Sequence, residues 1–282
     1  MRRTRYAAAA IAAVAALTLS ACGGDSGSES GSSEGAGEKI RIGIKFDQPG
    51  VGFKDGSAYT GFDVDVAKYV ANELGYPEDQ IEFVSTPSPQ RENMLENDQV
   101  DMILASYSIT DTRKEKIAFA GPYFVAGQDL LVSADNDEIK GPEDLNGKNL
   151  CSVTGSTSAQ KIKDTLASDA NLLEQPSYAE CVTAMQGGSI DAVTTDDIIL
   201  AGLASTDANK GSFKVVGNTF SEERYGVGLP KEEGLVKCED INTAITKMMD
   251  EGAWEEAIKK NTEGADYTFN ADLNPPIPDA CA

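Results

Sequence analysis

The chain has 282 residues, with 24 Lys and Arg against 46 Asp and Glu and a formal net charge of −22 at pH 7. This length is enough for one large domain or two medium ones, with ample room for a hydrophobic core. The 40% hydrophobic and 25% charged residues are typical of a soluble globular protein. The negative charge argues against nucleic acid as a partner, because phosphates are bound by clustered Lys and Arg.

The residue types that are missing exclude several kinds of chemistry. No histidine occurs in the sequence, which excludes Ser-His-Asp triads, Cys-His pairs and His-ligated zinc sites. The five cysteines include no CxxC pair, which argues against a zinc ribbon or a dithiol redox motif. We therefore predict neither a metal ion nor a cofactor.

The N-terminal residues are typical of a secretory signal. Three arginines precede an uncharged, Ala-rich run over 6–19. A transmembrane anchor is the alternative, which the short run of weakly hydrophobic alanines disfavours. The LSAC tetrapeptide that ends at Cys22 resembles a bacterial lipobox. Residues 1–21 are therefore predicted to be a lipoprotein signal peptide, and Cys22 to carry the lipid that holds the protein at the membrane.

Residues 22–38 are predicted to be a disordered tether. After Cys22 they contain only Gly, Ser, Ala, Asp and Glu, and such a stretch cannot bury a core. A Gly/Ser-type tether of this length reaches roughly 20–24 Å on average. The folded body is expected to begin near Lys39.

Strand and helix patterns alternate from Lys39 onward. In chain order, the first half predicts strands at 39–45, 81–84 and 101–104 and helices at 63–74, 87–97 and 110–119. The second half predicts strands at 129–133, 148–153, 190–195, 213–216 and 225–229 and helices at 158–166, 178–186, 196–203, 235–250 and 254–260. This alternation predicts an α/β fold with a mixed or parallel sheet. Two units of similar size would leave a cleft, which is a preferred ligand site.

Six segments stand out by their order and spacing: GFDVDVA at 61–67, 97–105 around Val100-Asp101, TDTR at 110–113, FAGPY at 119–123, GST at 155–157 and IDA at 190–192. Together they resemble the extracellular solute-binding proteins of ABC amino-acid importers, family 3, with Ala120 where serine is usual. The resemblance covers Lys39 to about Lys260. Through DQPG at 47–50, SPQRE at 88–92 and CSVTGST at 151–157, the chain resembles most the glutamate-binding lipoproteins of actinobacterial importers.

The resemblance implies a two-lobed periplasmic-binding-protein fold of type II, with two α/β lobes joined by two crossover strands. The crossings are expected near 124–128 and 221–225. Lobe one would then comprise 39–126 and 223–282, and lobe two would comprise 127–222.

The remaining four cysteines are predicted to form disulfides, because their number is even and the protein is expected to be exported. Three connectivities are open. Pairing Cys151 with Cys181 and Cys238 with Cys281 keeps each bond within one predicted lobe, and the second bond would hold the Pro-rich tail. Four free thiols are the alternative.

Lobe one supplies the expected partner for the carboxylate of an α-amino acid, whose charges need partners once they leave water. Arg113 matches the carboxylate-binding arginine of the family, and a guanidinium donates two parallel hydrogen bonds to such a group. Ser108 and Thr110 match positions that add further donors. The alternative for Arg113 is a surface charge on its helix.

Lobe two supplies the expected partner for the ammonium. Asp196 matches the family's ammonium-binding acid, with Asp197 as its rival and a helix N-cap as the alternative role. Ser156 and Thr157 open a helix and match residues that touch the α-carboxylate. A simple N-cap is the alternative for both.

Two cations are expected to choose the side chain of the ligand. Arg91 matches an arginine that glutamate- and aspartate-binding relatives use for the distal carboxylate. Lys45 stands where relatives that bind basic ligands or glutamine often carry Asp. Salt bridges with Asp47 or Glu92 are the alternatives. Aromatic residues that could contact the ligand's aliphatic part are Phe46, Phe53 and Tyr59, whereas Tyr107 is interpreted as core.

The resemblance implies a monomeric, lipid-anchored binding protein on the extracytoplasmic face of the membrane. It would capture an acidic amino acid, glutamate before others, by lobe closure and deliver it to the membrane permease of an ABC importer. Glutamine or another polar amino acid is the alternative ligand. A small-acid dehydratase on the same fold would need a Glu or Lys base, and none remains beyond the binding residues, so no enzyme and no catalytic residue are predicted. A sensor input would need a separate signalling partner.

Overall fold

The computed structural model describes residues 39–166, 169–232 and 234–281. The predicted signal peptide, the lipidation at Cys22 and the tether lie outside these described residues. We use the predicted boundaries as working definitions of lobe one (39–126 and 223–282) and lobe two (127–222).

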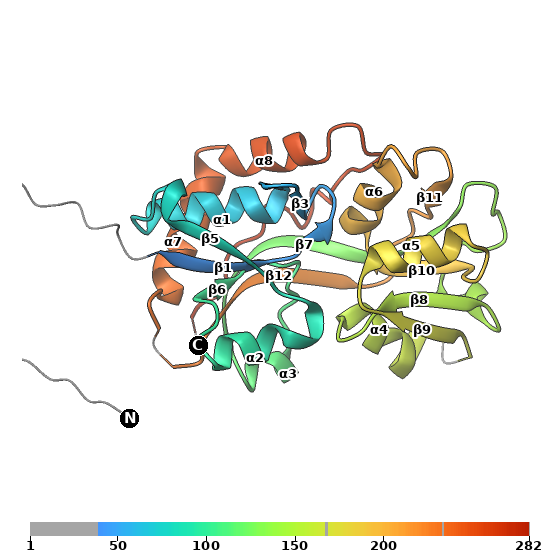
Figure 1. Ribbon diagram of the computed structural model, residues 1–282, viewed down its shortest axis with the longest axis horizontal. Helices are drawn as coiled ribbons and strands as arrows, with labels where there is room; N and C mark the ends of the chain where they lie inside the picture. The colour runs from blue at the N-terminus through green and yellow to red at the C-terminus, as the bar shows by residue number, and fades with distance from the viewer. Residues whose placement is uncertain (1–38, 167–168, 233, 282) are drawn as a thin grey trace, which may run out of the picture. The chain divides into compact units, whose positions relative to one another are not determined.

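The described strands form one long mixed sheet and one small sheet (Figure 1). The long sheet has the order β5-β1-β6-β12-β7-β10-β8-β9, with β11 paired to β7, and the small sheet has the order β2-β3-β4. The bounds are β1 Ile40–Ile44, β2 Asp47–Gln48, β3 Gly52–Asp55, β4 Ala58–Thr60, β5 Ile81–Ser85, β6 Met102–Ile103, β7 Ala118–Ser133, β8 Asn149–Val153, β9 Asn171–Gln175, β10 Ala192–Asp196, β11 Phe213–Val215 and β12 Glu222–Leu229.

Strand β7 belongs to both lobes. Its first part pairs antiparallel with β12, and the last of these pairs joins Gly127 to Glu222. Its second part pairs antiparallel with β10, beginning where Gln128 lies opposite Asp196. The two α/β lobes are therefore joined through one continuous strand, with β12 beside it, as the two-lobed fold predicts.

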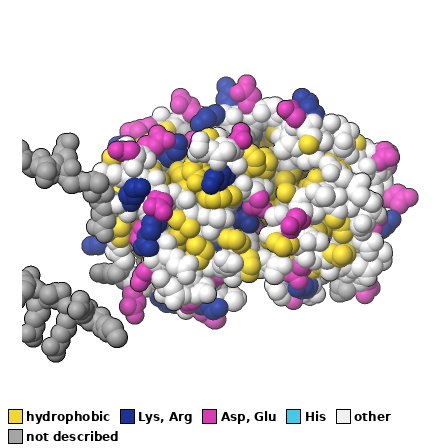
Figure 2. All heavy atoms as spheres, in the orientation of Figure 1, with side chains coloured by type: hydrophobic (Ala, Val, Ile, Leu, Met, Phe, Trp, Pro, Cys, Tyr) yellow, Lys and Arg dark blue, Asp and Glu magenta, His cyan; other side chains and the backbone are white. Residues whose placement is uncertain are grey.

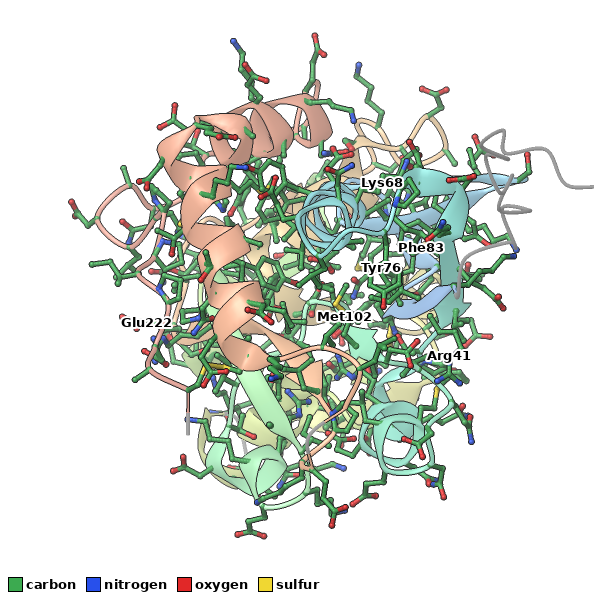
Figure 3. The ribbon with its side chains drawn as sticks, turned by 90° about the vertical axis from the view of Figure 1, so that its left-hand side faces the viewer. Arg41, Lys68, Tyr76, Phe83, Met102 and Glu222 are labelled. Carbon is green, nitrogen blue, oxygen red and sulfur yellow. A yellow bond between two sulfur atoms is a disulfide. The ribbon has the colours of Figure 1, made fainter. Side chains whose placement is uncertain are left out.

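Helices cover both lobes. In lobe one, α7 and α8 pack against α1, as Figure 3 shows from the side. Arg41, labelled in that figure, forms a 2.7 Å ion pair with Asp101 and ties β1 to the residues before β6. The bounds are α1 Phe62–Glu73, α2 Arg91–Glu96, α3 Asp111–Lys114, α4 Thr157–Lys161, α5 Tyr178–Gln186, α6 Asp197–Ser205, α7 Cys238–Asp250 and α8 Ala253–Asn261.

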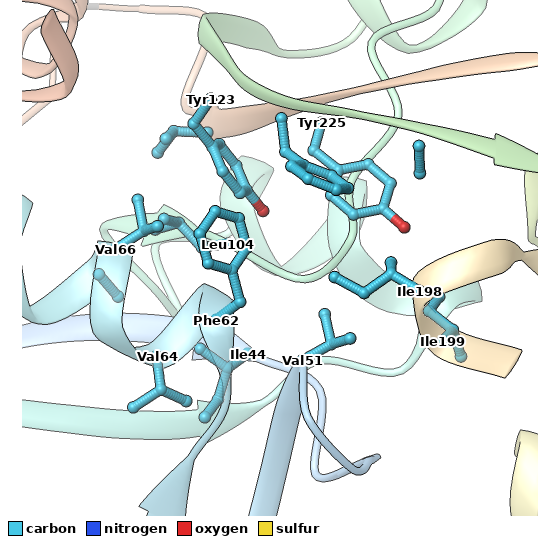
Figure 4. Close-up of a cluster of buried hydrophobic side chains, with 14 of the residues drawn as sticks. Ile44, Val51, Phe62, Val64, Val66, Leu104, Tyr123, Ile198, Ile199 and Tyr225 are labelled. Carbon is cyan, nitrogen blue, oxygen red and sulfur yellow. The ribbon is translucent and has the colours of Figure 1, made fainter. Parts of the chain in front are cut away.

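An aromatic cluster fixes the helices of lobe one on the shared strand. The ring of Phe62, on α1, lies 5.3 Å from that of Phe124 on β7 and 5.7 Å from that of Trp254 on α8. Trp254 also donates a 2.8 Å hydrogen bond to the carbonyl of Tyr123. The same buried cluster continues to Ile198 and Ile199 of α6 in lobe two (Figure 4). Apolar packing is thus continuous from one lobe to the other.

Both expected disulfides are present in the structure. Cys151 on β8 is bonded to Cys181 on α5, and Cys238 at the start of α7 is bonded to Cys281 in the tail. The tail also lies against β7, because the side-chain amide of Asn274 accepts a 2.9 Å hydrogen bond from the Val125 amide and donates a 2.8 Å bond to its carbonyl. The Pro-rich end is therefore held by a covalent bond and by the shared strand.

Several predicted elements differ from the structure. The helix expected over 110–119 ends at Lys114, and β7 already begins at Ala118. The residues that follow Ile117 form the start of β7 and pair with β12. These tertiary contacts override the helical pattern of the sequence. The small sheet β2-β3-β4 and the strand β9 were absent from the prediction, because these strands are short or polar and carry little periodic signal.

The surface has mixed charge on the face that Figure 2 shows, where basic and acidic side chains are interspersed around hydrophobic ones. Within the described ranges, no helix has both the length and the apolar character needed to cross a membrane.

Candidate functional site

A small polar cavity of about 10 Å³ lies between the two lobes. It is formed where the ends of β10 and α4 in lobe two face α2 and α3 in lobe one. The residues that line it from lobe one are Gln48, Ser88, Arg91, Ala105, Ser106 and Arg113, and those from lobe two are Ser156, Thr157, Ser158, Tyr178, Thr195, Asp196 and Ile199.

Arg91 is a buried cation that lines this cavity. Its Nη1 donates a 2.8 Å hydrogen bond to the carbonyl of Ala105. Its Nε is buried and has no hydrogen-bond partner among the described residues. Because a buried donor without a partner is costly, Arg91 is suited to receive an anion from the cavity.

Arg113 reaches the cavity from the first turn of α3, which Thr110 caps by accepting a 3.2 Å hydrogen bond from the Arg113 amide. Its Nη1 donates to the Ser108 carbonyl at 2.7 Å, its Nη2 donates to the Gly155 carbonyl at 3.3 Å, and its Nε lies 3.3 Å from the Glu92 carboxylate. Burial, with Arg91 nearby, lowers the pKa of Arg113 to about 10, so it stays charged at neutral pH.

The ring of Tyr107 contacts both guanidinium groups. The central carbons of Arg91 and Arg113 lie 4.2 Å and 4.8 Å from its ring centroid. Tyr107 is fully buried, as the sequence interpretation expected, but its contact with both arginines was not predicted. The face of the ring stabilises cations that water cannot reach.

Asp196, at the end of β10, is the acidic residue that lines the cavity opposite these arginines. Tyr225 donates a 2.6 Å hydrogen bond to its Oδ2, whereas its buried Oδ1 has no hydrogen-bond partner among the described residues. Burial, and then the nearby charge of Glu223, raise the pKa of Asp196 well above its usual value. Its side chain makes no capping bond to α6, so a cation in the cavity would be its natural partner.

Asp197, the predicted rival, does not line this cavity. Its Oδ1 accepts hydrogen bonds from the amides of Ile198 and Gly127, at 2.7 Å and 3.4 Å, and from the hydroxyl of Tyr267, at 3.5 Å. It lines a separate groove formed by α6, β11 and residues 264–270. Burial raises the pKa of Asp197 to about 6.

Replacing Asp197 with asparagine is expected to stabilise the ligand-free protein at pH 7. The asparagine side chain keeps the acceptor Oδ1 but carries no charge. Because folding raises the pKa of Asp197 from 3.8 to about 6, the folded protein favours the protonated carboxyl. As pH increases through this window, the free energy of unfolding of the wild type therefore falls by up to about 3 kcal/mol relative to that of D197N. Denaturant unfolding of both proteins between about pH 3.5 and 7.5 measures the difference. Parallel pH profiles would contradict it.

The four hydroxyl residues have distinct positions. Ser156 and Thr157 line the cavity, and Ser156 also caps α4 by accepting a 3.0 Å hydrogen bond from the Ala159 amide. Thr157 donates to Glu223 at 3.0 Å, and its hydroxyl lies 3.3 Å from that of Ser108. Ser108 and Thr110 are not among the lining residues, and both contact Arg113 instead.

Lys45, the second cation predicted to contact the ligand's side chain, is not among the residues that line this cavity. Its Nζ lies 3.4 Å from the Asp47 carboxylate, as the alternative interpretation expected. Burial lowers the pKa of Lys45, and the Asp47 charge opposes this effect. The other predicted pairing also differs, because Glu92 contacts Arg113 rather than Arg91.

Sequence reasoning missed several lining residues. None of the three suggested aromatic residues lines the cavity, and the aromatic residue that does is Tyr178, whose hydroxyl accepts a 2.6 Å hydrogen bond from Thr195. Gln48 lines it from lobe one and accepts a 2.9 Å hydrogen bond from Ser106. Gln48 lies in the DQPG segment, which was the only signal that could have pointed to it.

Direct contacts cross between the lobes beside the cavity. Arg113 reaches Gly155, Ser108 meets Thr157, and Tyr225 reaches Asp196. The structure therefore describes the lobes in contact. In the described part of the chain, no group of three or more Cys, Asp or Glu residues is arranged to hold a metal ion.

Comparisons with known proteins agree with this architecture. The glutamate-binding protein GluB of Corynebacterium efficiens is 42% identical over 270 residues, which cover 92% of this chain and 90% of that protein. The glutamine-binding protein GlnH of Bacillus subtilis is 36% identical over 90% of this chain and 96% of its own length. The solved structure of an ancestral arginine-binding protein bound to glutamine has a TM-score of 0.72 and 33% identity, covering 79% of this chain and 96% of that one.

These relatives are named as binding proteins and not as enzymes, in agreement with the predicted role. Residues 40–263 match the family described as bacterial extracellular solute-binding proteins, family 3. On the strength of this match and of the two-lobed fold, the chain belongs to the bacterial extracellular solute-binding proteins of family 3.

Proposed function

We propose that this protein captures an acidic amino acid, glutamate before others, and delivers it to the permease of an ABC importer. The observation that carries the proposal is the charge of the cavity. In the described part of the chain, the charged residues that line it are Arg91, Arg113 and Asp196. Two cations and one anion complement the two carboxylates and one ammonium of glutamate.

Each charged group of glutamate has a proposed partner. The α-carboxylate binds Arg113 from lobe one and the hydroxyls of Ser156 and Thr157 from lobe two. The ammonium binds the unpartnered Oδ1 of Asp196, and the distal carboxylate binds Arg91 through its unpartnered Nε. These pairs remove the cost of leaving buried charges without partners.

Ligand binding is proposed to close the lobes. Arg113 and Asp196 belong to different lobes and hold opposite charges of the same zwitterion. The ligand therefore has more contacts in the closed arrangement than in an open one, and it shifts the population toward closure. The permease would recognise the closed form. We further propose that a lipid on Cys22 holds the monomer at the extracytoplasmic face of the membrane.

The names of the relatives support glutamate as the ligand and make glutamine the main alternative. Two relatives that are named for glutamate are 42% and 41% identical over about 90% of this chain, and two that are named for glutamine are 36% identical over 90% and 40% identical over 69% of it. Glutamine would leave the second arginine without an anion. A charge-assisted site should therefore prefer glutamate by on the order of 100-fold or more.

Titration calorimetry of the purified protein with glutamate, aspartate, glutamine and lysine tests the proposal. Tight binding of glutamate, with glutamine weaker by on the order of 100-fold or more and lysine inert, is the expected result. Equal affinity for glutamate and glutamine would contradict the proposed preference for an acidic amino acid. Binding of lysine alone, or of none of the four, would refute the proposed function.

A further inference from the structure

The DQPG segment forms a turn of lobe one that is fixed on several sides. The amide of Val51 donates a 3.0 Å hydrogen bond to the Gln48 carbonyl and closes the turn. The amide of Phe62, at the start of α1, donates a 3.1 Å bond to the Gly50 carbonyl. Gly50 also faces the carbonyl of Asn261 at the end of α8, where a Cβ would lie only 2.8 Å from that oxygen. This turn is therefore attached to α1 by a backbone hydrogen bond and packs against the end of α8.

Helix α6 of lobe two approaches this turn and is equally fixed. Ile198, Ile199, Leu200 and Leu203 are all buried. Figure 4 shows Ile198 and Ile199 in the same hydrophobic cluster as Val51, which follows the turn. The turn and the helix thus belong to different lobes and share one apolar cluster, so relative movement between them accompanies movement of the lobes.

The two approach each other closely at Gly202, in the middle of α6. A Cβ built on Gly202 would lie 1.9 Å from the carbonyl oxygen of Pro49, whereas real Cβ atoms essentially never come within 3.0 Å of another heavy atom. Glycine is a poor helix former, and Gly202 has no positive φ that would require it. The close approach of the Pro49 carbonyl is the structural reason for glycine at this position.

We propose that Gly202 sets how far the two lobes close. The absence of a side chain lets α6 rest on the main chain of the Pro49 turn, and this contact is the stop at the end of closure. The inference rests on the proposed function, because it gives that closure its end point. It adds a residue that touches no ligand but determines the spacing between Arg113 and Asp196.

A methyl group at Gly202 would hold the lobes apart by roughly 1 Å, which is the difference between 1.9 Å and the shortest real contacts. Two of the polar contacts across the cleft are already long. The Arg113–Gly155 hydrogen bond is 3.3 Å long, and the Ser108 and Thr157 hydroxyls are also 3.3 Å apart. A further shift of about 1 Å takes both beyond hydrogen-bond distance. A ligand that binds Arg113 in one lobe and Asp196 in the other would then lose its contact with one of the two lobes.

Gly155 makes a second close approach, since a Cβ there would lie 3.0 Å from the Cα of Pro89 in lobe one. Its φ of 76°, however, favours glycine for a local reason as well. Gly202 is therefore the cleaner position to test, because alanine suits its helical backbone. Gly187, at the end of α5, provides a matched control in the same lobe, where a Cβ would have its nearest neighbour at an ordinary 3.5 Å.

The experiment compares wild type, G202A and G187A by calorimetry with glutamate, by small-angle X-ray scattering with and without glutamate, and by thermal melting without it. We expect G202A to bind glutamate at least tenfold more weakly, to show less compaction than wild type, and to melt no lower in the ligand-free state. G187A should match wild type in affinity and compaction. Affinity within twofold of wild type and equal compaction of G202A would overturn the inference.

Two further outcomes separate the possible failures. If G202A melts well below wild type without ligand, Gly202 supports the fold of lobe two rather than the end point of closure, and the inference fails. If wild type itself does not bind glutamate, the proposed function fails, and a crystal structure of ligand-free G202A then decides the inference alone. Displacement of α6 from Pro49 in that crystal would support it, and an unchanged lobe arrangement would refute it.

Discussion

Replacing Arg113 with alanine is expected to weaken binding of every α-amino acid by at least about 100-fold. Its guanidinium is the proposed partner of the α-carboxylate, which all such ligands share, and loss of a buried charge-assisted pair costs about 3–5 kcal/mol. Calorimetry with glutamate and glutamine measures the effect. Both ligands should lose affinity together, since the change removes the contact they have in common.

The control for this variant lies next to it in the same helix. Lys114 is exposed and is not among the residues that line the cavity, so K114A should bind as wild type does. R113K keeps a positive charge but loses the planar fork, and it should recover only part of the affinity. Because Arg113 also contacts Ser108 and Glu92, melting temperatures of both variants are needed. Retained binding by a folded R113A would contradict the proposed role.

Replacing Arg91 with alanine is expected to change selectivity rather than binding as a whole. Arg91 is the proposed partner of the distal carboxylate, which glutamate has and glutamine lacks. Loss of this pair should reduce glutamate affinity by roughly 2–4 kcal/mol, on the order of 100-fold, and should leave glutamine affinity nearly unchanged. Competition calorimetry with the two ligands gives the ratio directly.

The same variant has a second informative property. The Nε of Arg91 is buried without a hydrogen-bond partner among the described residues, so its burial is costly in the ligand-free state. R91A should therefore melt at a temperature close to that of wild type when no ligand is present. An equal loss of affinity for glutamate and glutamine would instead place Arg91 at a group that both ligands share.

Local patterns predicted the fold best where no distant strand competes for the same residues. Helix α5 was predicted with its observed bounds, because Ser177 caps it and its apolar residues follow one face. The helix predicted over 110–119 was too long, because its last residues are needed to pair with β12, which is far away in sequence. Pairing between strands that are far apart in the sequence cannot be predicted from the periodicity of a short window.

The candidate site shows the same division. Motif resemblance pointed to Arg91, Arg113 and Asp196, and the structure gathers all three around one cavity. Motif resemblance could not identify Tyr178, because this residue reaches the cavity through the packing of α5 against β10. Position on a strand does not tell which way a long side chain turns, and the Nζ of Lys45 lies 3.4 Å from the Asp47 carboxylate, with Lys45 not among the residues that line the cavity.

The strand β7 has a consequence for the integrity of the whole body. It completes the sheet of lobe one with its first half and that of lobe two with its second half, so neither lobe has a full set of strands of its own. A break or a misfolded stretch in β7 would leave an open edge in both sheets at once. The lobes move as two bodies in the proposed cycle, but they are bound to fold, and to fail, as one cooperative unit.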